Sequence, residues 1–373
     1  MFLTSPDGGL AHYVVHVWGP ISGYLDPMFV TFRSPGLDEL VRVVVADPRP
    51  LLEPEDSASV GRVIELARSR QVRVANLHSG TRTKQNHAYF GQLLRGLREC
   101  GIQIVLHLHD LGIHSTGESD AEAVAALCRE ADAILVGSGK ELQILRGMPG
   151  AAGKHLGLMF HGPYTLLDEG RIGQRQARDA LGIEPAAPVI LAFGSLRSEK
   201  RLDDLLAAFP LVRQRLPATV LLMQSELRHS GGEALSSIEA QAAQPGVRLS
   251  TGYAPLSRVE TLFRAADVVA LPYESVASSG VLNLARAFAR PVVVTDCFEP
   301  SKSIDGACGY RVPVRDPEAL ADALIRTLEA PAAERTRLGA GWSRILREET
   351  WANAARALWE ACQTTATTPC ETP

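Results

Sequence analysis

The sequence lacks the motifs and composition of several large protein classes. Its six cysteines contain no C-x-x-C pair, so we expect reduced thiols and neither a disulfide framework nor a zinc site. No apolar run approaches about 18 residues and no charged-then-apolar leader occurs, so neither a membrane span nor secretion is predicted. Walker, G-x-S-x-G and H-E-x-x-H motifs are absent, which disfavours ATPases, serine hydrolases and zinc proteases. The formal net charge of −4 gives no indication of nucleic-acid binding.

The chain instead has the length and alternation of a two-domain α/β protein. Its 373 residues, 46% of them apolar, exceed what one core usually holds. Short apolar runs alternate with helical patterns throughout, which predicts parallel sheets covered on both faces. We expect two doubly wound, Rossmann-like domains with the ligand in the cleft between them. The expected strands are Phe2–Ser5, Met28–Phe32, Val41–Ala46, Val72–His78, Ile102–His109, Ala133–Gly137, Leu156–Phe160, Val189–Phe193, Thr219–Gln224, Val247–Thr251, Asp267–Tyr273, Pro291–Thr295 and Tyr310–Val312.

Chain-breaking residues set the expected boundaries. His161-Gly162-Pro163 interrupts the pattern, and Pro185–Pro188 is typical of a linker. We assign 1–165 to an acceptor-side domain, 166–345 to a donor domain, and 346–373 to a crossover helix with a flexible, Thr/Pro-rich tail.

The segment Pro272–Asp296 is the most informative part of the chain. An apolar strand leads into Ser278-Ser279-Gly280, and a helix and a second strand follow. Backbone N–H groups at a helix start, with almost no side-chain bulk around them, can hold a phosphate or diphosphate. Glu274 precedes them and can bind sugar hydroxyls. The predicted ligand is an anionic group joined to a polyol.

A basic segment follows the first strand of the second domain. Arg197 and Lys200 stand between that strand and the helix Leu202–Arg215, where cations can neutralise a diphosphate. A solvated basic turn is the alternative interpretation.

The strand Ile102–His109 carries His107 and His109 on the same side, with His109-Asp110 at its carboxyl end. His109 can bind a sugar hydroxyl or stabilise charge at the reacting carbon, or it can be a structural residue. No third ligand has suitable spacing, so no metal site is predicted.

Two weaker patterns lie in the first domain. Asp7-Gly8-Gly9 follows the first strand and lets a ligand approach the backbone, although a plain tight turn gives the same pattern. Arg62 to Arg98 holds eight basic side chains and one acid, Glu65. This segment suits either anionic lipid head groups, a phosphorylated acceptor, or an ordinary solvated face.

Taken in order, these pieces resemble glycosyltransferase family 4, with the GT-B fold. The resemblance covers nearly the whole chain and rests on FLTSPDGGLAHYV, LHLHDLG, HGPY, FGSLRSEKRLDDLL, GYAPLSRVETLFRAADVVALPYESVASSGVL, RPVVVTD and GYRVPVRDPEALADAL, with Trp351 near the end. It implies transfer of a sugar from a UDP- or GDP-linked donor to an acceptor hydroxyl, with retention. No cofactor and no metal ion are expected, since the nucleotide-sugar is a substrate.

The resemblance also implies roles for residues at matching positions. His109 and Glu274 are the candidate catalytic residues, beside the transferred sugar. Asn283 is the candidate nucleoside contact. The donor diphosphate is assigned to Gly8, Gly9, Arg197, Lys200, Ser279, Gly280 and Val281.

Two positions depart from the family pattern. Ser195 stands where an arginine usually follows the glycine, and Arg197 is the expected substitute. Leu284 stands where a glutamate usually binds the ribose. These departures leave an alternative open, in which the chain is a non-catalytic GT-B protein that binds a nucleotide-sugar or assists a partner transferase. A sugar-nucleotide epimerase of similar fold would need further acidic groups.

The expected protein is therefore a transferase acting in polysaccharide, glycolipid or glycosylated-metabolite synthesis. We expect the protein in the cytoplasm. If its acceptor is lipid-linked, we expect peripheral contact with the inner face of the membrane.

Overall fold

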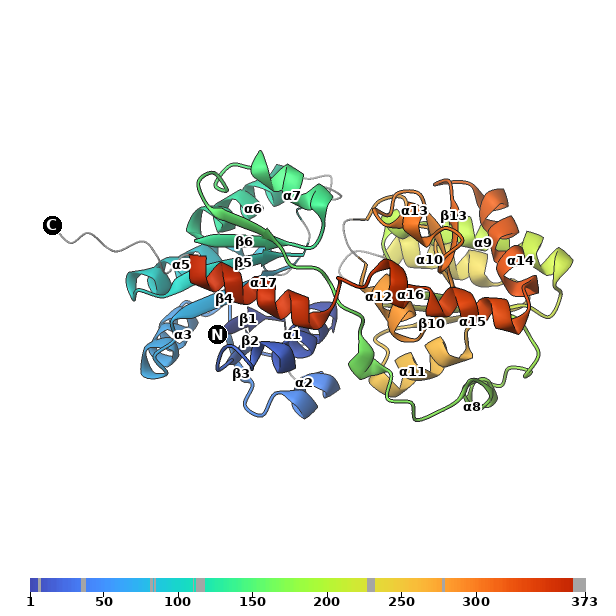
Figure 1. Ribbon diagram of the computed structural model, residues 1–373, viewed down its shortest axis with the longest axis horizontal. Helices are drawn as coiled ribbons and strands as arrows, with labels where there is room; N and C mark the ends of the chain where they lie inside the picture. The colour runs from blue at the N-terminus through green and yellow to red at the C-terminus, as the bar shows by residue number, and fades with distance from the viewer. Residues whose placement is uncertain are drawn as a thin grey trace. The chain divides into compact units, whose positions relative to one another are not determined.

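The structure is a computed structural model that describes residues 1–5, 8–34, 38–80, 83, 85–109, 111, 118–226, 232–276 and 279–364. The chain folds as two compact units, one formed by Met1–Gly162 with Glu348–Pro373 and the other by Pro163–Arg347. Each unit contains one parallel sheet, and Figure 1 shows the helices that cover it. Among the described residues, no helix combines the length and the apolar character needed to cross a bilayer.

The first unit is built on a seven-stranded sheet in the order β3-β2-β1-β4-β5-β6-β7. This doubly wound order reverses between β1 and β4, and ligands of such sheets bind at the carboxyl ends of the strands near that point. The strands are β1 Phe2–Thr4, β2 Phe29–Phe32, β3 Arg49–Leu52, β4 Val74–Ser79, β5 Gln103–Leu108, β6 Ala133–Val136 and β7 His155–Leu158. The helices are α1 Gly8–Ile21, α2 Glu39–Val44, α3 Ala58–Ser69, α5 His87–Glu99, α6 Glu118–Glu130, α7 Gly139–Arg146 and α17 Trp351–Thr364.

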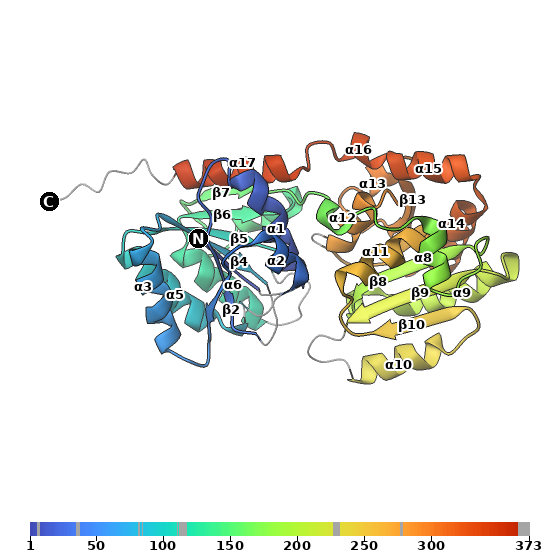
Figure 2. The ribbon, with the colours of Figure 1, turned by 90° about the horizontal axis from the view of Figure 1, so that it is seen from below.

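The two faces of this sheet are covered differently. Apolar side chains of α3, α5 and α6 form one core with the sheet residues Leu3, Leu77 and Leu106. On the opposite face, α1 lies with α17, as Figure 2 shows. Tyr13 of α1 is 1% exposed, and its ring centroid lies 4.9 Å from that of Trp351. The polar side of β4 and β5 is therefore buried beneath α1.

The second unit repeats the same plan with six strands in the order β10-β9-β8-β11-β12-β13. Its order reverses between β8 and β11. The strands are β8 Val189–Ser195, β9 Val220–Glu226, β10 Val247–Thr251, β11 Val268–Leu271, β12 Val292–Thr295 and β13 Gly309–Val312. The helices are η1 Thr165–Leu167, α8 Gln174–Ala180, η2 Ser198–Lys200, α9 Leu202–Arg215, α10 Gly232–Ala242, α11 Leu256–Ala265, α12 Gly280–Ala287, α13 Ser301–Ile304, α14 Pro317–Glu329, α15 Ala332–Ala340 and α16 Trp342–Ile345.

The predicted strand Val41–Ala46 is wrong. The side chain of Asp38 accepts a hydrogen bond from the N–H of Leu40 at 2.9 Å and caps helix α2. Val41 is buried while Val43 is 78% exposed, so the β-branched run does not lie between two layers. The strand is formed instead by Arg49–Leu52, an edge strand that tolerates Pro50. The local cap outweighs β propensity here.

Candidate functional site

The carboxyl end of β8 brings a cation to the start of α12. Gly194 has φ +112°, a conformation that favours glycine. A Cβ atom at this position would lie 2.6 Å from Nζ of Lys200 and 3.2 Å from Cγ2 of Val281. The bare glycine therefore lets the ammonium group and the first turn of α12 meet above β8, beside the point where the strand order reverses.

Helix α12 supplies hydrogen-bond donors at this place. The hydroxyl of Ser279 accepts from the N–H of Leu282 at 3.2 Å and caps the helix. Gly280 and Val281 follow as the first helical residues, whose N–H groups have no partner within a helix. These donors and the helix dipole favour an anion. Ser278, predicted beside them, lies outside the described residues.

Lys200 is buried, whereas Arg197 is not. Lys200 is only 7% exposed, and its Nζ lies 5.4 Å from the ring centroid of Tyr273. Arg197 is exposed and its Nε pairs with a carboxylate oxygen of Glu199 at 3.1 Å. The structure thus distinguishes the two predicted cations, and only Lys200 is held at α12.

Glu274 follows β11 and is held through both its backbone and its side chain. Its N–H donates to the carbonyl of Glu199 at 2.8 Å, which ties the loop after β11 to the basic segment. Its carboxylate pairs with the guanidinium of Arg315. Arg315 has φ +56° and directly precedes Asp316, the residue that caps the first turn of α14. A sugar hydroxyl that reaches Glu274 therefore meets a carboxylate already oriented by a cation.

Position 284 offers no acidic group, and the neighbouring asparagine has an unused acceptor. Leu284 is 6% exposed and packs inside the unit. Asn283 donates through Nδ2 to the carbonyl of Ser279 at 3.3 Å, while its buried Oδ1 has no hydrogen-bond partner. A buried acceptor without a partner is costly, so it suits a ligand hydroxyl or N–H.

In the first unit, α1 begins at Gly8 directly after the loop that follows β1. Gly9 is exposed on its first turn. Both glycines therefore stand at a helix start and at the reversal point of their sheet, as an anion contact requires. Asp7 lies outside the described residues.

His109 follows β5 and belongs to a histidine cluster. His78 Nδ1 lies 2.9 Å from His109 Nε2, and the rings of His107 and His109 stack with centroids 4.1 Å apart. The three side chains offer nitrogen atoms within 4.8 Å of one another. Sequence spacing did not predict this third imidazole, because it comes from β4, whose residue His78 pairs with His107 in the sheet.

All three imidazoles are held neutral. Burial lowers the pKa of His78 and His107 well below the usual value, and so does the proximity of the other histidines. The pKa of His109 is lowered in the same way, by burial first and then by His107 and His161. A neutral imidazole can accept or donate a hydrogen bond but carries no positive charge.

Three arginines in the basic segment of the first unit are paired with acidic side chains. Arg62 pairs with Glu53 and Asp56 at 3.0 and 2.9 Å. Arg95 pairs with Glu130 at 2.9 Å, and Arg98 lies 3.6 Å from Asp132. These pairs indicate a solvated, balanced surface. Arg82 and Lys84 lie outside the described residues.

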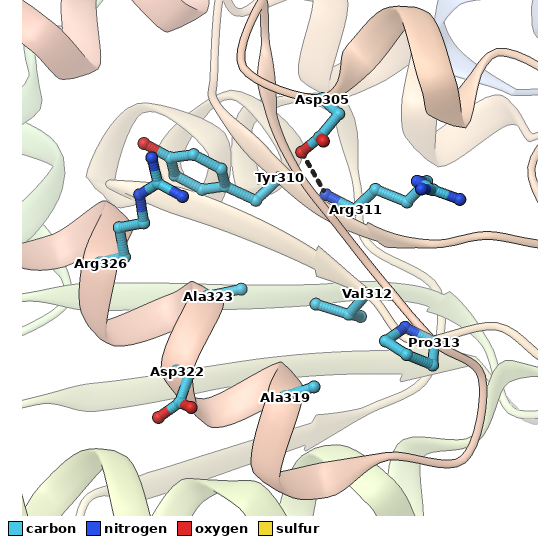
Figure 3. A pocket seen from close by; sticks show the side chains of 9 residues that line it. All are labelled: Asp305, Tyr310, Arg311, Val312, Pro313, Ala319, Asp322, Ala323 and Arg326. Atoms are coloured by element: carbon cyan, nitrogen blue, oxygen red, sulfur yellow. Dashed lines mark hydrogen bonds between the residues drawn. The ribbon is translucent and has the colours of Figure 1, made fainter.

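A separate hollow of about 370 Å³ lies between β13 and α14 (Figure 3). Arg326 stacks on Tyr310, with its guanidinium carbon 4.2 Å from the ring centroid. The N–H of Arg311 donates to Asp305 at 3.1 Å. Because β13 is the edge strand, this hollow is away from the reversal point, and none of the predicted site residues lines it.

Several residues of these sites were not predicted. Gly194 and Arg315 are revealed by positive φ angles, which a sequence does not state. Asn76 and His78 carried a usable signal, since they alternate along β4 as His107 and His109 do at the end of β5 and directly after it.

Known proteins resemble this chain in sequence and in fold. Residues 187–330 match the family described as glycosyl transferases group 1. The D-inositol 3-phosphate glycosyltransferase of Saccharomonospora viridis is 32% identical over 206 residues, covering 52% of this chain and 47% of that protein. The chain spans about half the length of the curated relatives that it matches.

Two solved structures resemble nearly the whole chain. Anabaena HepE, in complex with UDP and glucose, has a TM-score of 0.78 at 15% identity and covers 97% of this chain and 98% of its own. Sucrose-phosphate synthase from Thermosynechococcus elongatus has a TM-score of 0.73 at 18% identity, covering 98% and 99%. The expected GT-B fold and the resemblance to family 4 glycosyltransferases are confirmed.

Proposed function

We propose that this chain of GT-B fold, whose residues 187–330 match the glycosyl transferases group 1, is a retaining hexosyltransferase that uses a UDP-linked sugar. The observation that carries the proposal is the meeting of Lys200 with the start of α12 above Gly194. A buried ammonium group and free backbone donors form a place for two phosphates, at the point of the sheet where ligands bind.

In the proposed reaction, the diphosphate leaves with growing negative charge. Lys200 and the N–H groups of Ser279, Gly280 and Val281 stabilise that charge as it develops. Arg197 exchanges Glu199 for a phosphate oxygen when the donor binds. In their own unit, Gly8 and Gly9 stand at the start of α1, where backbone N–H groups favour an anion. No metal ion is needed in this scheme, because protein groups supply the positive charge.

The sugar carbon becomes oxocarbenium-like as the leaving group departs. His109 lies beside the transferred sugar, and its neutral imidazole tolerates the developing positive charge. Glu274 binds sugar hydroxyls, and its carboxylate is oriented by the ion pair with Arg315. The acceptor hydroxyl attacks from the face that the diphosphate leaves and gives its proton to the departing phosphate oxygen, so the anomeric configuration is retained.

Support for the two substrates comes from different observations. The free Oδ1 of Asn283 suits a nucleoside hydroxyl or N–H in the absence of an acidic residue at 284. A uridine donor is favoured over guanosine because HepE holds UDP and glucose. A phosphorylated polyol is the first acceptor to test, since the matching relatives are named for inositol 3-phosphate. Polysaccharide and lipid-linked acceptors are the next ones to test.

The test is transfer from UDP-glucose and other UDP- and GDP-hexoses to a panel of acceptors, with release of nucleotide as the measure. Proton NMR of the product reports the anomeric configuration, and EDTA tests the need for a metal. We expect UDP to raise the melting temperature and turnover to persist with EDTA. Tight UDP binding with no turnover on any acceptor would instead establish a non-catalytic binding protein.

A further inference from the structure

A chain of buried hydrogen bonds places the protons on two histidines. The amide nitrogen of Asn76 donates to the carbonyl of Val105 at 3.0 Å, which turns its oxygen toward His78. That oxygen lies 2.8 Å from Nε2 of His78. Since Oδ1 can only accept, Nε2 of His78 carries the proton and Nδ1 keeps its lone pair.

The same reasoning extends to His109. Nδ1 of His78 lies 2.9 Å from Nε2 of His109. Because the His78 nitrogen has a lone pair, Nε2 of His109 must be the donor. His109 is then left with its lone pair on Nδ1.

The surroundings of His109 keep it in one form. Asn76 is 4% exposed and His78 is fully buried, so water cannot replace either partner. Among the residues that the structure describes, the titratable side chains around His109 are His78 from β4, His107 from β5, Tyr13 from α1 and His161 after β7. None of these four is a carboxylic acid, so none of them supplies an anion that would favour a charged imidazolium.

We propose that Asn76 and His78 are positioning residues that hold His109 as the Nε2–H tautomer, with an accepting lone pair on Nδ1. The consequence for transfer rests on the proposed function, in which His109 lies beside the sugar. A lone pair accepts a hydrogen bond from a sugar hydroxyl and complements a carbon that becomes positive. The opposite tautomer would present a donor and oppose that charge.

A metal site in the same cluster is the competing explanation. His107 Nδ1 is buried without a hydrogen-bond partner, as an empty ligand position would be. However, the rings of His107 and His109 stack at an interplanar angle of 27°. Lone pairs lie in the ring plane, and nearly parallel planes do not converge on an ion about 2.1 Å from both nitrogens. The hydrogen-bonded pair of His78 and His109 therefore fits the geometry better.

The proton positions can be measured without any activity. Long-range ¹H–¹⁵N NMR of histidine-labelled protein distinguishes the two tautomers, with His78→Phe and His109→Ala used for assignment. We expect Nε2–H on His109 in the wild type and a mixture of tautomers in Asn76→Leu, which removes the acceptor of His78. A wild-type Nδ1–H tautomer, or an unchanged tautomer in Asn76→Leu, would overturn the proposal.

Steady-state kinetics test the effect on transfer. We expect Asn76→Leu and His78→Phe to lower kcat about tenfold to a hundredfold, with the donor KM within about twofold. The matched control is His107→Phe, which is equally buried and stacked but lies outside the hydrogen-bond chain. It should keep the tautomer and a kcat within about twofold of the wild type. An equal loss in His107→Phe would mean that ring packing, not proton placement, matters.

Three further outcomes separate the explanations. Circular dichroism must show that each variant is folded; if Asn76→Leu is not, His78→Phe gives the same kinetic test. Visible absorption of tetrahedral Co²⁺, abolished in His78→Phe, would show a metal site and overturn the proposal. If the wild type shows the expected tautomers but transfers no sugar, the proposed function is refuted, and the positioning role is refuted with it. The hydrogen-bond chain itself would stand.

Discussion

Substitution of Gly194 by alanine directly tests the proposed phosphate-binding site at Lys200 and the start of α12. The new Cβ would lie 2.6 Å from Nζ of Lys200, whereas ordinary contacts begin at 3.4 Å, so the ammonium group must move by about 1 Å. A charge-assisted hydrogen bond contributes about 1.5–3 kcal/mol, and a displacement of that size removes much of it. We expect a loss of about 1–2 kcal/mol in UDP binding, roughly 5- to 30-fold in Kd.

Backbone strain contributes separately and has its own control. Alanine at φ +112° is strained by about 1–2 kcal/mol, which lowers the melting temperature by a few degrees. Gly252 has φ +101° with nothing within 4 Å of a built Cβ, so Gly252→Ala carries the strain without the clash.

Calorimetric titration with UDP and thermal melts of both variants separate the two effects. Both should melt lower, but only Gly194→Ala should bind UDP more weakly. Equal UDP affinity in the two variants would show that Lys200 does not touch the diphosphate.

Three further predictions follow from the same structure. Lys200→Ala should weaken UDP binding by roughly 2 kcal/mol by calorimetry, and an unchanged affinity would remove Lys200 from the site. Trp351→Ala should destabilise the first unit by about 3–5 kcal/mol, because the indole is 8% exposed and packs on Tyr13. Thermal melts and limited proteolysis measure this loss of stability. A melting temperature equal to that of the wild type would contradict the packing. The first unit should also lose stability as the pH falls below about 6.5, because unfolding lets three neutral histidines bind protons. The free energy of unfolding then falls by up to about 4 kcal/mol per pH unit, and this dependence is absent above about pH 6.5. Melts across pH 5–8 measure this slope, which should be shallower in His107→Phe.

The sequence was most informative where local chemistry and global position agree. Small residues before α12 and a basic segment after β8 predicted an anion site, and the structure places Val281 and Lys200 together. The same patterns could not say which cation is buried, because the short helix η2 decides that Lys200 is buried and Arg197 is exposed. Val41–Ala46 was misassigned because its β-branched residues suggested a strand, whereas the cap at Asp38 starts a helix.

Contacts between strands were beyond sequence reasoning. His78 and His109 are separated by 31 residues and meet only because β4 and β5 pair in parallel. Likewise, Arg315 reaches Glu274 across 41 residues of chain.

The sequence by itself determined the class of the protein: alternating apolar runs demand parallel sheets with helices on both faces, and glycine and serine at helix starts mark where anions bind. Only the tertiary structure decided which side chains act together. Strand register joins Asn76, His78 and His109 into one hydrogen-bond chain. The left-handed backbone at Gly194 leaves the space in which Lys200 meets α12. Both depend on distances between segments remote in sequence, which periodicity and propensity do not encode.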